Sequence, residues 1–144
     1  MVTSELSIVI DAPPEEVFAR ISNPMNSMED VPNVVEVTDV TGQGEGMSYR
    51  MVYKMAGIRL DLDCTLIEYI PNEQVTYETK GGSDAKQTWK LSPQDGGCKL
   101  VVSATYSIPV PLIGKIAELL LKRLNDKEWE AVLANIKARI EAED

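Results

Sequence analysis

Apolar and polar residues alternate with a period of two through most of the chain, which is typical of strands with one buried face. In the clearest run, residues 47, 49, 51, 53 and 55 are all methionine or tyrosine, and polar residues separate most of them. Short turns with glycine or proline separate the alternating runs, which favours a meander of antiparallel hairpins. The expected strands are residues 3–10, 34–41, 47–55, 59–66, 74–79, 85–91 and 98–106. This pattern leaves the order of the strands in the sheet open.

Two segments depart from this period and predict helices. Residues 11–18 read Asp-Ala-Pro-Pro-Glu-Glu-Val-Phe, where proline and two acids suit the first turn of a helix. That helix is expected to end at Asn23-Pro24, and residues 25–30 form either a helical turn or a loop. Residues 112–142 lack proline and predict a helix of about 30 residues. Polar residues 125–128 interrupt its apolar stripe, which predicts a bend or a change of facing.

Composition excludes several kinds of chemistry. The 144 residues suit one domain, residues 1–144, and contain no histidine. Histidine-dependent catalytic triads, the common zinc sites and a histidine pH switch are therefore excluded. We predict neither a metal nor a cofactor.

The charge of the chain limits its partners. Fourteen basic and 23 acidic residues give a net charge of −9, which opposes binding to nucleic acid. Residues 1–45 contain nine acids and one base. This acidic third is either a solvated surface or a docking surface for a basic protein partner.

Cysteine usage and hydropathy bear on location. The two cysteines, Cys64 and Cys98, lie far apart and form no metal-binding or redox motif. The first residues lack the pattern of a secretory signal, and no apolar run is long enough to span a membrane. We therefore expect a cytoplasmic protein with reduced thiols and no integral membrane association.

Three motifs in order carry a family resemblance. They are the helix entry at residues 10–18, the segment Pro32-Asn33-Val34-Val35-Glu36-Val37, and a proline-flanked final helix with three leucines and a closing Asn135-Ile136-Lys137. In these features the chain resembles the START-like (SRPBCC) superfamily, in its polyketide cyclase/dehydrase and lipid-transport branch. An aromatic residue that often precedes the second motif is absent, since Met28-Glu29-Asp30-Val31 stands there. No catalytic signature of the family can be carried over to particular residues.

The resemblance implies an α+β helix-grip fold. In that fold a curved, seven-stranded antiparallel sheet wraps around a long C-terminal helix, and one or two short helices lie between the first two strands. Such proteins usually hold an elongated apolar cavity between sheet and helix.

The methionine and tyrosine face is the candidate wall of that cavity. Methionine adapts to irregular shapes, and a buried tyrosine adds a flat surface and a polar tip. A core filled by the same side chains is the alternative. With inward positions on later strands and on the helix, the candidate ligand-binding residues are Tyr49, Met51, Tyr53, Leu62, Cys64, Leu66, Tyr77, Gln87, Trp89, Tyr106, Leu120 and Leu124.

Three functions fit these features. The first is binding alone, or binding and transport, of a hydrophobic small molecule such as a lipid, polyketide or isoprenoid. The second is a polyketide cyclase or aromatase activity in which Tyr49, Tyr53 or Glu68 moves protons. Glu68 continues the leucine register beyond Leu66, so its carboxylate lies either at the cavity end or exposed at the strand end. The third is an acidic protein-interaction module.

Overall fold

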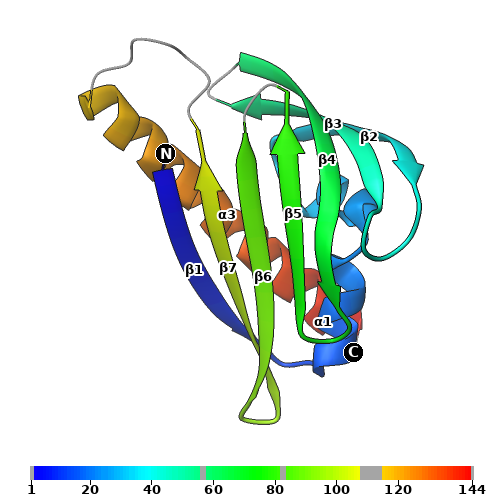
Figure 1. The fold of residues 1–144 in the computed structure, drawn as a ribbon. Helices are drawn as coiled ribbons and strands as arrows, with labels where there is room; N and C mark the ends of the chain where they lie inside the picture. The colour runs from blue at the N-terminus through cyan, green and yellow to red at the C-terminus, as the bar shows by residue number, and fades with distance from the viewer. Residues whose placement is uncertain (1, 56–57, 82–83, 108–114, 144) are drawn as a thin grey trace.

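A seven-stranded sheet and a long C-terminal helix dominate the computed structural model, which describes residues 2–55, 58–81, 84–107 and 115–143 (Figure 1). The strands are β1 (Val2–Ile10), β2 (Val34–Thr41), β3 (Ser48–Met55), β4 (Ile58–Ile70), β5 (Gln74–Lys80), β6 (Ala85–Gln94) and β7 (Gly97–Tyr106). The helical elements are α1 (Pro14–Ile21), the 3₁₀ turn η1 (Pro24–Asn26), α2 (Ser27–Asp30) and α3 (Lys115–Glu143).

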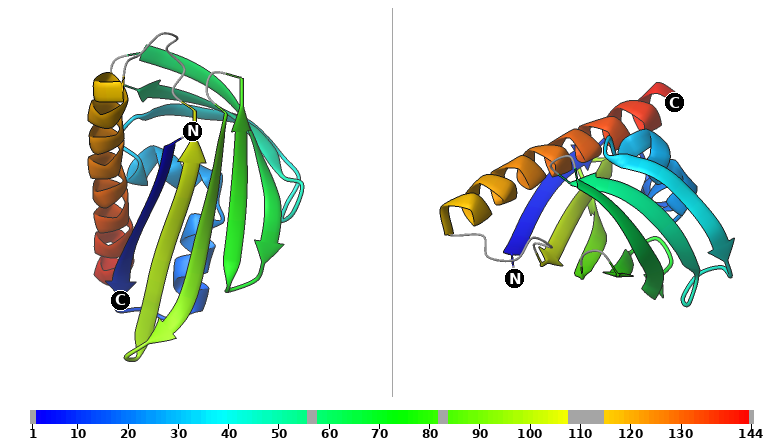
Figure 2. Two further views of the ribbon diagram at one scale, coloured as in Figure 1. Left: turned by 60° about the vertical axis from the view of Figure 1, so that its left-hand side comes forward. Right: turned by 90° about the horizontal axis from the view of Figure 1, so that it is seen from above.

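The strands form one antiparallel sheet in the order β1-β7-β6-β5-β4-β3-β2. Strands that are neighbours in the sheet are also consecutive in the sequence, except for the pair β1 and β7. The predicted meander is therefore confirmed, and β1 forms the edge of the sheet beside β7. Figure 2 shows the sheet curving, with α3 along its concave side and α1 and α2 beside the C-terminal half of α3. The expected α+β helix-grip fold, with short helices between the first two strands, is confirmed.

Helix α1 begins where its proline and acids predict. Pro14 occupies its first turn together with Glu15 and Glu16, and Val17, Phe18 and Ile21 are buried. The helix is closed by a hydrogen bond of 3.0 Å from the backbone N–H of Ser22 to the carbonyl of Phe18. Residues 24–30 form η1 and α2, so this segment is helical and not a loop.

Helix α3 changes its facing, as the polar interruption in its sequence predicts. Val132, Leu133, Ile136 and Ile140 are buried, whereas Leu119, Leu120 and Leu124 are exposed. The helix contacts β1, α1 and α2. Residues 112–114, which the sequence also assigns to this helix, lie outside the described residues.

Two glycines shape the hairpin between β6 and β7 and its contact with β1. Asp95 and Gly96 both have positive φ, at 48° and 80°, and connect the paired residues Gln94 and Gly97, as in a type I′ turn. A Cβ atom on Gly97 would lie 2.4 Å from the carbonyl oxygen of Ile10. The missing side chain therefore lets the end of β1 approach β7 closely.

Candidate functional site

A pocket of about 140 Å³ lies between the concave face of the sheet, the α1–α2 segment and α3. Its wall is mostly apolar, and we call it the sheet–helix pocket. It is lined by these residues of the predicted ligand-binding set: Tyr49, Met51, Tyr53, Leu62, Tyr77, Gln87, Trp89 and Tyr106. The period-two register brings them together, because inward residues of neighbouring strands stand side by side.

Cys64 and Leu66 share the inward face of β4 but do not line the pocket. Their side chains are buried, with exposed fractions of 1% and 0%. Burial raises the pKa of the Cys64 thiol to about 12. The two residues belong to the packed core, and both cysteines of the chain are free.

The expected positions of Leu120 and Leu124 at the cavity are wrong. Their exposed fractions are 56% and 57%, and neither lines the pocket. Both precede the polar interruption of α3, where the apolar stripe faces away from the sheet. Trp129, Val132 and Ile136, which follow the interruption, line the pocket instead.

Glu68 lies outside the pocket because a β-bulge changes its facing. Leu66 pairs with Tyr77, but Glu68 pairs with Thr76, so one extra residue enters β4 between them. Such a bulge moves the following side chains to the other face of the sheet. The Glu68 carboxylate accepts hydrogen bonds from the Gln74 amide and, at 3.0 Å, from the Thr76 hydroxyl.

Two tyrosines stiffen the centre of the wall. The rings of Tyr49 and Tyr77 meet edge to face, with centroids 6.3 Å apart. The Tyr77 hydroxyl donates to the carbonyl of Ile21 at 2.7 Å, which ties β5 to the end of α1. Burial raises the pKa of both phenols above the ordinary value, so both stay neutral hydrogen-bonding groups.

A tyrosine and a carboxylate meet in the wall, although the sequence pointed only to the tyrosine. The Tyr53 hydroxyl donates a hydrogen bond to the Glu128 carboxylate from α3. Burial raises the pKa of Glu128, while hydrogen bonds from Tyr53 and Asn33 lower it in part. Burial also raises the pKa of Tyr53, and the neighbouring Glu128 adds to this rise.

The position of Glu128 was within reach of sequence reasoning. Glu128 belongs to the polar interruption of α3 and stands four residues before Val132 of the inward stripe. Residues four apart share a helix face. A polar residue on the inward face was the available signal.

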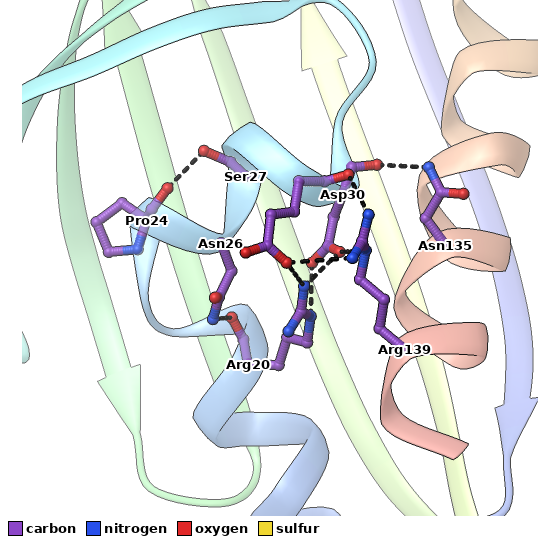
Figure 3. A network of polar contacts seen from close by, with 8 residues as sticks. Arg20, Pro24, Asn26, Ser27, Asp30, Asn135 and Arg139 are labelled. Carbon is purple, nitrogen blue, oxygen red and sulfur yellow. Dashed lines mark hydrogen bonds and ion pairs between the residues drawn. The ribbon is translucent and has the colours of Figure 1, made fainter. Parts of the chain in front are cut away.

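An ionic network around the largely buried pair Arg20–Asp30 lies at the α1–α2 end of the pocket (Figure 3). Arg20 donates from Nε and Nη2 to both carboxylate oxygens of Asp30, at 2.9 and 2.8 Å. Arg139 of α3 also reaches Asp30, at 3.3 Å, and Glu29 pairs with both arginines. The Asn135 amide donates to the Asp30 carbonyl at 3.0 Å.

This network joins α1, α2 and α3. Asp30 is 4% exposed, and its hydrogen bond raises the pKa of Arg20. Arg20 and Asp30 both line the pocket. The sequence indicated only an excess of acids here, because a pairing across 109 residues leaves no local pattern.

Two buried polar atoms of the wall, Nε1 of Trp89 and Nε1 of Trp129, have no hydrogen-bond partner within the described protein. The indole rings of Trp89 and Trp129 meet edge to face, with centroids 5.7 Å apart. Burial raises the pKa of Tyr106, and side-chain hydrogen bonds with Ser4 and Asn125 lower it in part.

Comparison with known proteins agrees with this architecture. The family model described as "Polyketide cyclase / dehydrase and lipid transport" matches residues 1–141. No curated protein matches the sequence. None of the helices in the described residues is both long and apolar enough to cross a membrane.

Several solved structures share the fold at low sequence identity. The protein TTHA0849 from Thermus thermophilus is 20% identical, with a TM-score of 0.87 and 99% of both chains covered. The Zhui aromatase/cyclase from Streptomyces sp. R1128 is 15% identical, with a TM-score of 0.81, covering 97% of this chain and 93% of its own. A START superfamily protein from Mycobacterium smegmatis is 12% identical, with a TM-score of 0.80 and 99% of both chains covered.

Proposed function

The chain belongs to the polyketide cyclase / dehydrase and lipid transport family, and from this membership we propose that it binds a hydrophobic small molecule in the sheet–helix pocket. The observation that carries the proposal is the wall itself. Apolar side chains such as Met51 and Leu62 make up most of it, and a few polar tips such as Tyr53 and Gln87 interrupt it. Small-molecule sites typically combine these two features.

The volume of the pocket bears on the size of the ligand. An engineered apolar cavity of about 150 Å³ binds benzene, and this pocket has about 140 Å³. A ligand of one ring therefore fits it as it stands, and a second fused ring requires the wall to move slightly. A longer lipid or polyketide chain requires part of the molecule to remain outside the pocket or the wall to open.

Native mass spectrometry and titration test this proposal. We expect a small apolar molecule to co-purify, or the protein to bind tetralin, a two-ring hydrocarbon, in calorimetric titration. Leu62→Phe adds volume inside the wall and should weaken tetralin binding at least tenfold. Leu120→Phe is the matched control on the exposed face of α3 and should leave the affinity unchanged.

Two results would contradict the binding proposal. One is the absence of both a co-purifying molecule and any binding of tetralin. The other is equal loss of affinity in Leu62→Phe and Leu120→Phe, which would place binding elsewhere. Circular dichroism of each variant separates loss of binding from loss of fold.

The Tyr53–Glu128 pair favours acid–base catalysis as a second candidate function. A buried carboxylate with a raised pKa is a stronger base than an ordinary one once it is ionised. Glu128 would remove a proton from the carbon next to a ligand carbonyl, and Tyr53 would orient its carboxylate. This leaves an enolate and a protonated Glu128. The carboxyl of Glu128 exchanges its proton with solvent and returns one to the same carbon, which restores both the ligand and the base.

Deuterium exchange measures this step directly. In D₂O, the protein should speed exchange at the carbon next to the carbonyl of 1-tetralone, the ketone of tetralin, as followed by NMR. Glu128→Gln should abolish the acceleration, and Tyr53→Phe should reduce it, while both variants still bind the ketone. Exchange no faster than in buffer, or unchanged in Glu128→Gln, would discard the catalytic role and leave the binding proposal intact.

A further inference from the structure

Each polar group of the pocket wall that lacks a partner can donate a hydrogen bond. These groups are the indole N–H groups of Trp89 and Trp129, which donate and cannot accept. Leaving a buried donor without an acceptor is unfavourable, and each such group in a folded protein calls for an explanation. A ligand that brings an acceptor oxygen supplies one.

The donors gather at one part of the wall. Trp89 lies on β6, and Trp129 approaches from α3. The two indoles contact each other, and Trp129 packs on the small cluster that contains Tyr106 and Ala104. The rings that carry the two indole donors therefore meet where the sheet faces the helix.

The charges around the pocket favour a neutral acceptor. Arg20 is the one cationic side chain among the described residues that line it, and Asp30 and Glu29 already bind its guanidinium. The carboxylate of Glu128 lines the same pocket. A ligand carboxylate would thus be buried beside an acid without a free cation, which is unfavourable. A carbonyl oxygen accepts hydrogen bonds without this cost.

We infer that the ligand is a neutral ring compound whose carbonyl oxygen accepts hydrogen bonds from the indole N–H groups of Trp89 and Trp129. This inference rests on the proposed binding function and names the chemical class of its ligand. Both indole nitrogens are covered by protein in this structure, so binding requires the rings to turn toward the pocket. A ketone, ester or lactone of one or two rings satisfies the description.

Three probes of nearly the same shape test the inference. Tetralin has no polar group, 1-tetralone adds one carbonyl, and 1,2,3,4-tetrahydro-1-naphthoic acid adds a carboxylate. Calorimetry at pH 7 should give about tenfold tighter binding for 1-tetralone than for tetralin, as expected for one or two buried donors that gain an acceptor. The acid should bind more weakly than the ketone.

The chain contains only two tryptophans, so its two indole N–H signals in a ¹⁵N-edited NMR spectrum report on this site alone. Addition of 1-tetralone should move them downfield, as hydrogen bonding does, and tetralin should not. Trp89→Phe and Trp129→Phe keep an aromatic ring and remove one donor each. Either variant should reduce the preference for the ketone, and each also assigns one NMR signal.

The possible outcomes separate the two proposals. If none of the three probes binds, the proposed binding function fails. If tetralin and 1-tetralone bind equally, or the ketone leaves both indole signals of the unmodified protein in place, this inference is overturned and the binding function stands. Because the NMR measurement uses the unmodified protein, a variant that does not fold leaves the test intact.

Discussion

Removal of the Asp30 carboxylate should destabilise the protein far more than removal of an exposed carboxylate in a comparable ion pair. In Asp30→Ala, the Arg20 guanidinium loses both hydrogen bonds at 2.8 and 2.9 Å while its side chain, 12% exposed, stays largely out of water. Breaking a buried ion pair on one side costs about 3–5 kcal/mol. Glu29 remains as a partner of Arg20 at 3.1 Å, so we expect the lower end, about 3 kcal/mol.

The matched control is the pair Arg50–Asp63 on the sheet. Its atoms lie 3.3 Å apart, but the two side chains are 65% and 68% exposed. Exposed ion pairs contribute about 0–1 kcal/mol. Asp63→Ala should therefore change the free energy of unfolding by less than about 1 kcal/mol.

Urea unfolding followed by tryptophan fluorescence measures both effects. With an m-value of about 2 kcal/mol/M, the loss of about 3 kcal/mol in Asp30→Ala moves the unfolding midpoint down by about 1.5 M. The double variant Arg20→Met/Asp30→Leu replaces the pair by apolar side chains and should be more stable than Asp30→Ala, since no uncompensated charge stays buried.

A midpoint for Asp30→Ala within about 0.5 M of the unmodified protein, which corresponds to about 1 kcal/mol, would refute this reasoning. The network would then add no more than an exposed pair. A double variant less stable than Asp30→Ala would equally refute it, because the unpaired arginine would not be the source of the loss.

Three further predictions follow from other parts of the structure. Gly97→Ala should destabilise by about 2 kcal/mol or more in the same urea assay, since its Cβ would lie 2.4 Å from the Ile10 carbonyl oxygen; unchanged stability would mean that β1 and β7 do not meet so closely. Burial raises the pKa of Tyr49, Tyr53 and Tyr77, so their stabilising contribution is complete below pH of about 10 and is lost above it. Stability should fall as pH rises from about 10, and tyrosinate absorbance in the near ultraviolet should grow mainly on unfolding; early ionisation of these phenols in the native protein would count against their burial. Leu120→Gln and Leu124→Gln should leave tetralin affinity unchanged, whereas a loss of more than threefold by calorimetry would show that these leucines contact the ligand.

The sequence pattern was sufficient to predict those features of the fold that residues close in the sequence determine. The proline and acids before Val17 predict the start of α1, and alternation along β3 predicts which side chains face inward. The polar residues 125–128 predict that α3 changes its facing. Each of these features depends on residues close in the sequence. Adjacent residues determine where a helix begins, and the side chains of a strand change face at every residue.

Bulges are the main reason why other facings were not predictable. A strict period of two places Val35 with Val37, yet Val35 is 53% exposed while Val34 and Val37 are buried, because a register shift interrupts β2 at this point. The bulge before Glu68 acts in the same way. A single extra residue in a strand leaves no mark in hydropathy, but it exchanges the two faces for every residue that follows.

Long-range polar pairs were also out of reach. Asp30 meets Arg139 and Asn135, and Tyr53 meets Glu128, only after the sheet has curved around α3. The pocket itself is the space that the packed side chains leave unfilled. Its volume depends on how completely side chains fill the concave face, which composition does not determine.

The absence of histidine limits the groups that can transfer protons in the pocket. The pair proposed for proton transfer there is Tyr53 and Glu128, and burial raises the pKa of both, which favours their neutral forms. The single cation of the described wall, Arg20, is held by Asp30 and Glu29. Such a site has little means to stabilise a charged ligand. Binding a neutral carbonyl compound uses the donors that are present, and catalysis beyond enolisation would need a group that the wall does not offer.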